Sequence, residues 1–220
     1  MLTRSSVISG CSYGNTYSTI QIADQCWVAE NLKVTSCQNG VPIDFPHTVD
    51  SVWQSNTTGA YAWQENDIYW KDIYGALYNW FAVNNPNGLC PAGWHVPNND
   101  DWNELTDFTG GIYHPNGNKL KTCRQIGSPL GGDCNTEEHP RWEWHSTNFG
   151  TDDFSFSALP GGFKYSNGSF SSYGVNGGYW SASSASSDNA WYRLLNSWSG
   201  QINVEENMKN FGFSVRCLMD

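Results

Sequence analysis

The sequence predicts a single α+β domain. Two segments, about residues 72–83 and 100–108, carry apolar residues at helical spacing, and both precede a series of short strands separated by glycine turns. The 12 Trp, 11 Tyr and 10 Phe supply enough apolar surface for a core that folds on its own. Composition does not change abruptly, so we expect one domain over residues 13–220, after an N-terminal extension or remnant over residues 1–12.

The N-terminal part of this domain is predicted to be a hairpin at the edge of a sheet. Its strands would span about residues 16–22 and 26–32, with the bend near residues 23–25. The next segment, 38–70, is polar and rich in turn residues, so we expect it to be long and irregular. Five aromatic side chains are expected to pin it to the core: Trp53, Tyr61, Trp63, Tyr69 and Trp70.

The first predicted helix spans residues 72–83. Ile73, Leu77 and Trp80 recur at helical spacing, and the sequence Asn-Asn-Pro at 84–86 would end the helix.

The second predicted helix begins near residue 100, with Asn98 or Asn99 as its N-cap. Asp100 and Asp101 fall in its first turn, where carboxylates complement the helix dipole, so we interpret them as capping residues and not as ligands. Three residues would face the core: Trp102, Leu105 and Phe108.

The C-terminal third is predicted to consist of short strands joined by turns. The expected strands are 154–159, 161–165, 169–173, 178–182, 190–196, 201–204 and 211–218.

Charge excludes one class of partner. The formal net charge is −10 and no basic run occurs, so nucleic acid is not an expected partner. No stretch of about 20 apolar residues is present, so no transmembrane segment is expected.

The seven cysteines favour disulfides over a metal site, because none forms a CxxC motif or a Cys/His pair at zinc spacing. Disulfides imply an oxidising compartment such as a periplasm, a cell surface or the outside of a virion. Cys123 and Cys134 are expected to close a loop of their own, whereas the pairing of Cys11, Cys26 and Cys37 stays open.

The segment 190–196 has two interpretations. As a strand it would place Trp191, Arg193 and Leu195 on one side, and Tyr192, Leu194 and Asn196 on the other. Either it is buried on both faces, or it belongs to a binding face. The second interpretation is favoured because residues 197–201 continue with Ser, Trp, Gly and Gln, whose chemistry is typical of adaptable binding loops.

Other candidate sites are weaker. None of the five histidines accompanies a recognisable nucleophile motif, so no catalysis is expected. His139 and His145 flank residues 141–144. This segment is either a metal or sugar site or an aromatic loop that packs on the domain. Arg216 is either a binding residue or a core arginine paired with an acid.

Calcium is a minor alternative, with no cofactor as the main expectation. Oxygen-bearing clusters occur at 98–101, 152–153 and 188–189, but none has the Glu-Pro-Asn or Trp-Asn-Asp pattern of sugar-binding lectins.

Six motifs in order resemble one bacterial family, the Fibrobacter succinogenes major paralogous domain. They are QCWVAENL (25–32), YGALYNW (74–80), CPAGWHVP (90–97), FSALPGG (156–162), YWSAS (179–183) and GFSVRC (212–217). The resemblance implies a C-type lectin-like fold with two helices and a twisted, mainly antiparallel sheet with long irregular loops, in secreted or surface-anchored proteins. It also implies a disulfide between Cys90 and Cys217.

The same fold occurs in sulfatase-modifying oxidases, which use a cysteine pair near the C-terminus. Here that region holds Cys217 alone, so oxidase activity, with its copper or similar cofactor, is not expected.

The tail from Ala190 to Cys217 is similar to the C-terminal variable region of proteins diversified by retroelements. The resemblance implies that a lectin-like frame displays altered side chains at outward positions. Those positions hold Tyr192, Leu194, Asn196, Ser197, Trp198, Gln201, Asn203 and Glu205.

We therefore expect a receptor- or adhesin-type protein, monomeric, secreted or displayed on a bacterium or phage virion. It would bind a protein or glycan on another cell surface through about residues 179–210. Tyr192 and Trp198 would be aromatic anchors, and Asn196, Gln201 and Asn203 a hydrogen-bonding rim. The alternatives are a non-catalytic structural module of a larger surface protein and, less favoured, a calcium-dependent lectin or an oxidase.

Overall fold

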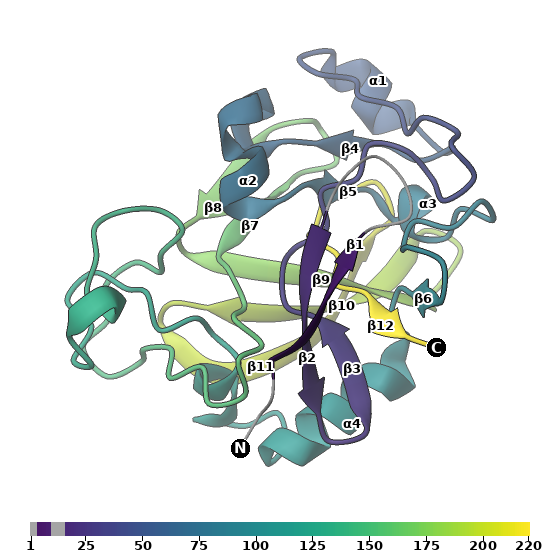
Figure 1. The fold of residues 1–220 in the computed structure, drawn as a ribbon. Coiled ribbons are helices and arrows are strands. Elements are labelled where there is room, and N and C mark those ends of the chain that lie inside the picture. Colours follow the sequence, from purple (N-terminus) through teal and green to yellow (C-terminus); the bar gives the residue numbers. More distant parts are fainter. Residues whose placement is uncertain (1–3, 10–15) are drawn as a thin grey trace.

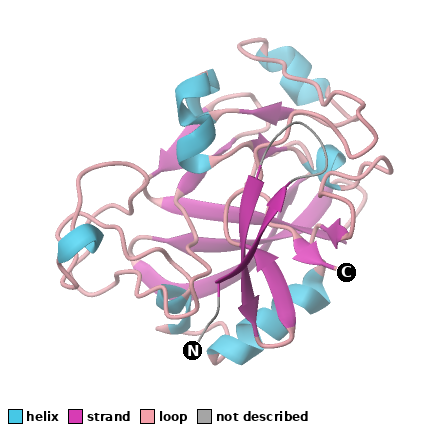
Figure 2. Cartoon of the chain, viewed as in Figure 1, coloured by secondary structure: helices cyan, strands magenta, loops and turns pink. Residues whose placement is uncertain are grey.

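A computed structural model describes residues 4–9 and 16–220, and Figure 1 shows their arrangement. Two five-stranded sheets and one two-stranded sheet make up its regular β-structure. Figure 2 shows that loops join most of these strands and that the helices lie around them.

The first sheet has the strand order β1-β2-β3-β12-β6, and all its pairs are antiparallel. The strands are β1 (Arg4–Ser9), β2 (Thr16–Ile22), β3 (Gln25–Val28), β12 (Leu218–Met219) and β6 (Trp94–His95). The expected hairpin is present as β2 and β3. It does not lie at an edge, because β1, from the segment expected to be an N-terminal extension, pairs with β2.

The second sheet has the order β11-β10-β9-β7-β8 and carries most of the C-terminal third. The strands are β11 (Ser199–Met208), β10 (Asn189–Asn196), β9 (Asn176–Ser184), β7 (Gly161–Lys164) and β8 (Phe170–Tyr173). Only β7 and β9 run parallel, so this sheet is mixed and mainly antiparallel, as expected. The expected strand 154–159 is wrong, since that segment is irregular apart from one bridge at Ala158. In the expected strand 211–218, residues 212–214 make isolated bridges and only Leu218 belongs to a strand, β12.

The segment 72–83 is not one helix. It divides into α2 (Lys71–Tyr74), β5 (Leu77–Tyr78) and α3 (Trp80–Val83), and β5 pairs with β4 (Tyr61–Ala62). Gly75 ends α2 with a φ of 75° and a ψ of −165°, a conformation that is essentially confined to glycine.

The second predicted helix is confirmed as α4 (Asn99–Thr109), with Trp102 and Leu105 buried. The expected core position of Phe108 is wrong, because this side chain is exposed. The Asn98 side chain accepts hydrogen bonds from the backbone of Asp100 and Asp101, and the Asp101 carboxylate accepts one from the backbone of Asn98 at 2.8 Å. This capping box satisfies backbone groups that an uncapped helix would leave unpaired. The remaining helical elements are α1 (Asp50–Ser55), η1 (Gln64–Asn66), η2 (Ile68–Trp70), η3 (Asn116–Lys119) and η4 (Gly132–Cys134).

The second sheet has apolar side chains on both faces. Trp180 of β9 and Tyr192 of β10 belong to one cluster, which includes Phe213. Tyr179 and Leu195 belong to a second cluster, which Trp102 of α4 joins from outside. The strands β9 and β10 therefore lie inside the molecule, whereas β11 and β8 form the edges of the sheet.

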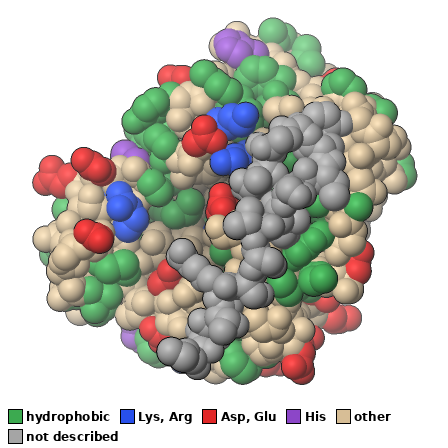
Figure 3. All heavy atoms as spheres, in the orientation of Figure 1, with side chains coloured by type: hydrophobic (Ala, Val, Ile, Leu, Met, Phe, Trp, Pro, Cys, Tyr) green, Lys and Arg blue, Asp and Glu red, His purple; other side chains and the backbone are tan. Residues whose placement is uncertain are grey.

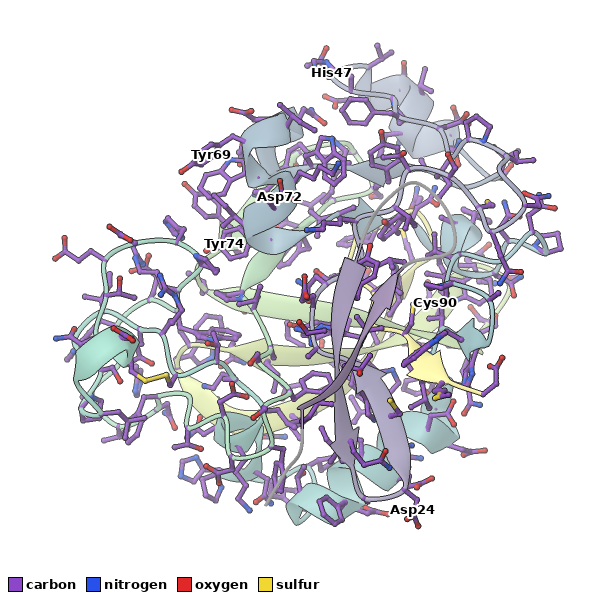
Figure 4. All side chains as sticks on the ribbon, viewed as in Figure 1. Asp24, His47, Tyr69, Asp72, Tyr74 and Cys90 are labelled. Carbon is purple, nitrogen blue, oxygen red and sulfur yellow. A yellow bond between two sulfur atoms is a disulfide. The ribbon has the colours of Figure 1, made fainter. Side chains whose placement is uncertain are left out.

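Two disulfides tie the loops to this frame. Cys90 pairs with Cys217, and Cys123 pairs with Cys134, so both expected pairings are present. Figure 4 shows Cys90 beside β12.

Arg216 is a core residue with 0% exposure. Its guanidinium donates to the carbonyl oxygens of Phe156 at 2.7 Å and Ser157 at 2.9 Å, and to the side-chain oxygen of Asn31 at 2.9 Å. These bonds join the loop before β7 to the region after β3. The acceptors are backbone and amide oxygens, in place of the acidic side chain that was expected to pair with Arg216.

Candidate ligand-binding face

Strand β10 is covered on both sides, so the expected outward position of Tyr192 is wrong. Tyr192 is 5% exposed and its ring stacks on Phe213, with centroids 4.4 Å apart. Its hydroxyl donates to the Glu205 carboxylate at 2.7 Å. Phe213 is not part of β10, so the residue pattern of β10 does not indicate that Tyr192 is covered by another ring.

The opposite side of β10 packs on α4. Arg193 is 2% exposed and donates to the side-chain oxygens of Asn99 and Asn103, both at 3.1 Å. Burial among these neutral acceptors lowers the pKa of Arg193 to about 10. The interpretation of β10 as a strand buried on both faces is the correct one.

The turn after β10 is held by buried polar contacts. Asn196 and Ser197 are 3% and 5% exposed, so neither presents its side chain as expected. The Lys121 ammonium donates to the carbonyls of Asn196 at 2.9 Å and Ser199 at 3.0 Å. Since Lys121 is 1% exposed, desolvation lowers its pKa to about 7.

Trp198 projects from this fixed turn. Its carbonyl accepts a hydrogen bond from the Asn148 side chain at 2.7 Å, while the side chain is 52% exposed. An indole held on a rigid backbone offers a large contact area with little conformational entropy to lose.

Strand β11 forms one edge of the second sheet and carries the expected polar positions. Asn203 pairs with Leu194 and Glu205 pairs with Tyr192, so these four side chains share one face of the hairpin. Gln201 and Asn203 are partly exposed and Glu205 is exposed. We call Leu194, Trp198, Gln201, Asn203 and Glu205 the hairpin face; Leu194 is half-buried and packs against the core.

A pocket of about 280 Å³ lies at the far end of this hairpin. Its walls combine the ends of β10 and β11 with α1 and α3, through residues that include Gln54, Phe81, Asp188, Met208 and Asn210. Asp188 and Asn210 fall within or next to the expected binding region, whereas Gln54 and Phe81 were missed because only the tertiary fold brings them to the hairpin.

Two of the three oxygen-bearing clusters, 98–101 and 152–153, have structural roles. Asn98 and Asp101 cap α4, and Asp152 accepts hydrogen bonds from the backbone and hydroxyl of Ser157. Among residues 4–9 and 16–220, no three His, Cys, Asp or Glu side chains are arranged to hold a metal ion.

The two flanking histidines pack into loops. His139 contacts the rings of Trp70, Tyr74 and Tyr173, and burial lowers its pKa. His145 accepts hydrogen bonds from the backbone of the Thr147–Asn148 segment. The aromatic-loop interpretation of residues 139–145 matches these contacts.

These features define a disulfide-linked α+β domain whose C-terminal hairpin presents an exposed edge. No helix in the described part of the chain is long and apolar enough to cross a membrane. The chain belongs to the Fibrobacter succinogenes major domain family, whose model matches residues 20–219. No curated protein and no solved structure gives a significant match to it.

Proposed function

We propose that this domain is a non-catalytic binding module that works outside the cytosol and contacts a protein or glycan on another cell through the hairpin face. The observation that carries the proposal is the half-exposed Trp198, which projects from a turn held by Lys121 and Asn148 at the start of the strand that carries Gln201, Asn203 and Glu205. A few aromatic anchors surrounded by polar groups dominate many binding interfaces.

The rigid frame supports this role. Binding residues are commonly displayed on loops and edges that a stable scaffold positions. Here the scaffold is the buried strand β10, packed on Phe213 on one side and on α4 on the other. Changes at Gln201 or Asn203 would therefore alter recognition with little effect on folding, whereas Glu205 also accepts the hydrogen bond of the buried Tyr192 hydroxyl.

The proposal includes a C-type lectin-like frame and a diversified tail. The six ordered motifs support the first, and polar residues at alternate positions of β11 support the second. The two disulfides suit a secreted or surface-displayed protein.

Diversification is tested by comparing genomic loci from several isolates. We expect codon changes to concentrate at the hairpin-face positions, with an asparagine-rich copy of the segment next to a reverse transcriptase gene. Changes spread evenly between β10 core positions and β11 outward positions would contradict diversification. They would favour a structural module.

Binding is tested with the fluorescently labelled domain on panels of fixed bacterial cells and immobilised glycans. The variant Trp198→Ala with Asn203→Ala should lose at least about tenfold in affinity for at least one target that the native domain binds. The control Tyr69→Ala removes an aromatic side chain of η2 that is 64% exposed and should leave affinity unchanged. Equal binding by the double variant, or no target on either panel, would contradict the proposal.

A further inference from the structure

A second hollow lies away from the hairpin face, in the irregular segment 38–70. It has a volume of about 510 Å³, within the range of small-molecule sites. Six of its lining residues carry the argument: Phe45, His47, Tyr61, Trp63, Asn66 and Asp67. In Figure 4, His47 marks the tip of the uppermost lobe, and in the same view Figure 3 shows hydrophobic side chains around that histidine.

The floor of the hollow is aromatic and fixed. Tyr61 and Trp63 are 8% and 3% exposed and belong to the main core cluster, with ring centroids 5.1 Å apart. Phe45 stacks on Tyr61 at 5.0 Å and 14°, yet is 37% exposed. Only Phe45 and Tyr61 are stacked, because Trp63 meets Tyr61 at 67° and His47 meets Phe45 at 88°. Of Phe45, Tyr61 and Trp63, Phe45 is the ring that a ligand can reach.

Polar groups surround this surface. The side-chain oxygen of Asn66 is buried and has no hydrogen-bond partner, although buried acceptors are normally paired. Asp67 supplies an exposed carboxylate, and His47 an exposed imidazole. Both His47 and Asn66 have positive φ, at 53° and 56°, and such strained residues cluster at ligand sites.

The chemistry of this lining selects a class of ligand. A pyranose ring presents C–H groups on one face, which suit an aromatic surface, and hydroxyl groups at its edge, which suit acceptors such as Asn66 and Asp67. The lining holds no Lys or Arg, and the chain has a net charge of −10, so anionic sugars are disfavoured.

We propose that this hollow is a calcium-independent site for a neutral pyranoside, such as a terminal hexose of a surface glycan. Phe45 provides the stacking surface, and Asn66 and Asp67 accept hydrogen bonds from ring hydroxyls. The site is separate from the hairpin face, so it does not depend on the function proposed above.

The test uses methyl glucoside, methyl galactoside and methyl mannoside in EDTA, with saturation-transfer NMR and calorimetric titration. We expect at least one glycoside to bind. Phe45→Leu, which keeps apolar bulk but removes the ring, and Asn66→Gly, which keeps the backbone freedom but removes the orphan oxygen, should each weaken binding by about tenfold or more.

Tyr113→Leu is the matched control, because it makes the same change at an aromatic side chain that is 73% exposed outside the hollow. It should leave binding unchanged, as should Trp198→Ala on the hairpin face. Circular dichroism checks that each variant is folded. The proposal is overturned by no binding up to about 10 mM glycoside, by binding of methyl glucuronide alone, or by equal affinity of the native, Phe45→Leu and Asn66→Gly proteins.

Discussion

Tyr192 and Trp198 lie six positions apart in one hairpin, and their surroundings predict opposite responses to truncation. Tyr192→Ala would open a cavity against Phe213 and should lower the free energy of unfolding by about 3–5 kcal/mol. Trp198→Ala removes a side chain that is 52% exposed and should cost about 1 kcal/mol or less. Urea denaturation of both variants measures the difference, and similar losses would refute the placement of Tyr192 in the core.

Lys121 predicts a pH dependence of stability. Its pKa falls from 10.5 to about 7 on folding, so between these values the unfolded chain binds the proton and the native chain releases it. Stability should therefore rise with pH, by up to about 1.4 kcal/mol per unit from this group. Below pH 7 Lys121 is protonated in both the folded and the unfolded chain, so its contribution to stability no longer changes with pH.

The measurement is urea denaturation between pH 7 and 9, below the range in which the tyrosines titrate. Lys121→Met should show a shallower rise than the native protein, whatever its absolute stability. Burial also lowers the pKa of Lys164, to about 8. Lys164 therefore makes stability rise with pH in both the native protein and the Lys121→Met variant. Equal slopes would mean that Lys121 stays charged between the carbonyls of Asn196 and Ser199.

Gly75 separates α2 from β5, and replacing it tests why the segment 72–83 is not one helix. A Cβ at this position would lie 2.8 Å from the Asn31 Cβ and 2.9 Å from the Leu32 carbonyl oxygen. Gly75→Ala should therefore cost about 2–5 kcal/mol, from this crowding and from backbone strain together.

Gly93→Ala is the matched control, because Gly93 also has a positive φ, 79°, but has no atom within 4 Å of the added Cβ. It should show the backbone strain alone, about 1–2 kcal/mol. Thermal or urea denaturation compares the two, and a Gly93 effect as large as that of Gly75 would contradict the steric explanation.

Elements with local determinants were predictable from sequence. The capping box at Asn98 and Asp101 lies within four residues, so it specified α4, and the turns around β9 and β10 located those strands. The division of 72–83 depends on Gly75 meeting Asn31 and Leu32, and the burial of Tyr192 depends on Phe213. These contacts join segments that are distant in the sequence. The residue pattern of a single strand or helix therefore does not predict them.

The candidate site was predictable in part for the same reason. Gln201, Asn203 and Glu205 are alternate residues of β11, so their shared face follows from the local period of two. The pocket that joins Gln54 and Phe81 to Met208 has no local signal.

The long disulfide constrains the entire domain more than the short one. Cys90 and Cys217 are 127 positions apart, whereas Cys123 and Cys134 are 11 apart. In the chain-entropy model the first link stabilises by about 5 kcal/mol and the second by about 3 kcal/mol. Cys90→Ser with Cys217→Ser should therefore lower stability more than Cys123→Ser with Cys134→Ser. Denaturation of both double variants checks this order, and the reverse order would contradict the entropic account.

The position of β12 between β3 and β6 has a consequence for biosynthesis. The first sheet cannot close until Leu218 reaches both of these neighbours, and Arg216 and Cys217 cannot bond to the N-terminal half before then. A ribosome-bound chain that still holds these residues in the exit tunnel would lack the strand that joins β3 to β6. Closure of this sheet would thus follow synthesis of β12, and the hairpin of β2 and β3 would wait for a partner that lies almost 200 residues later in the chain.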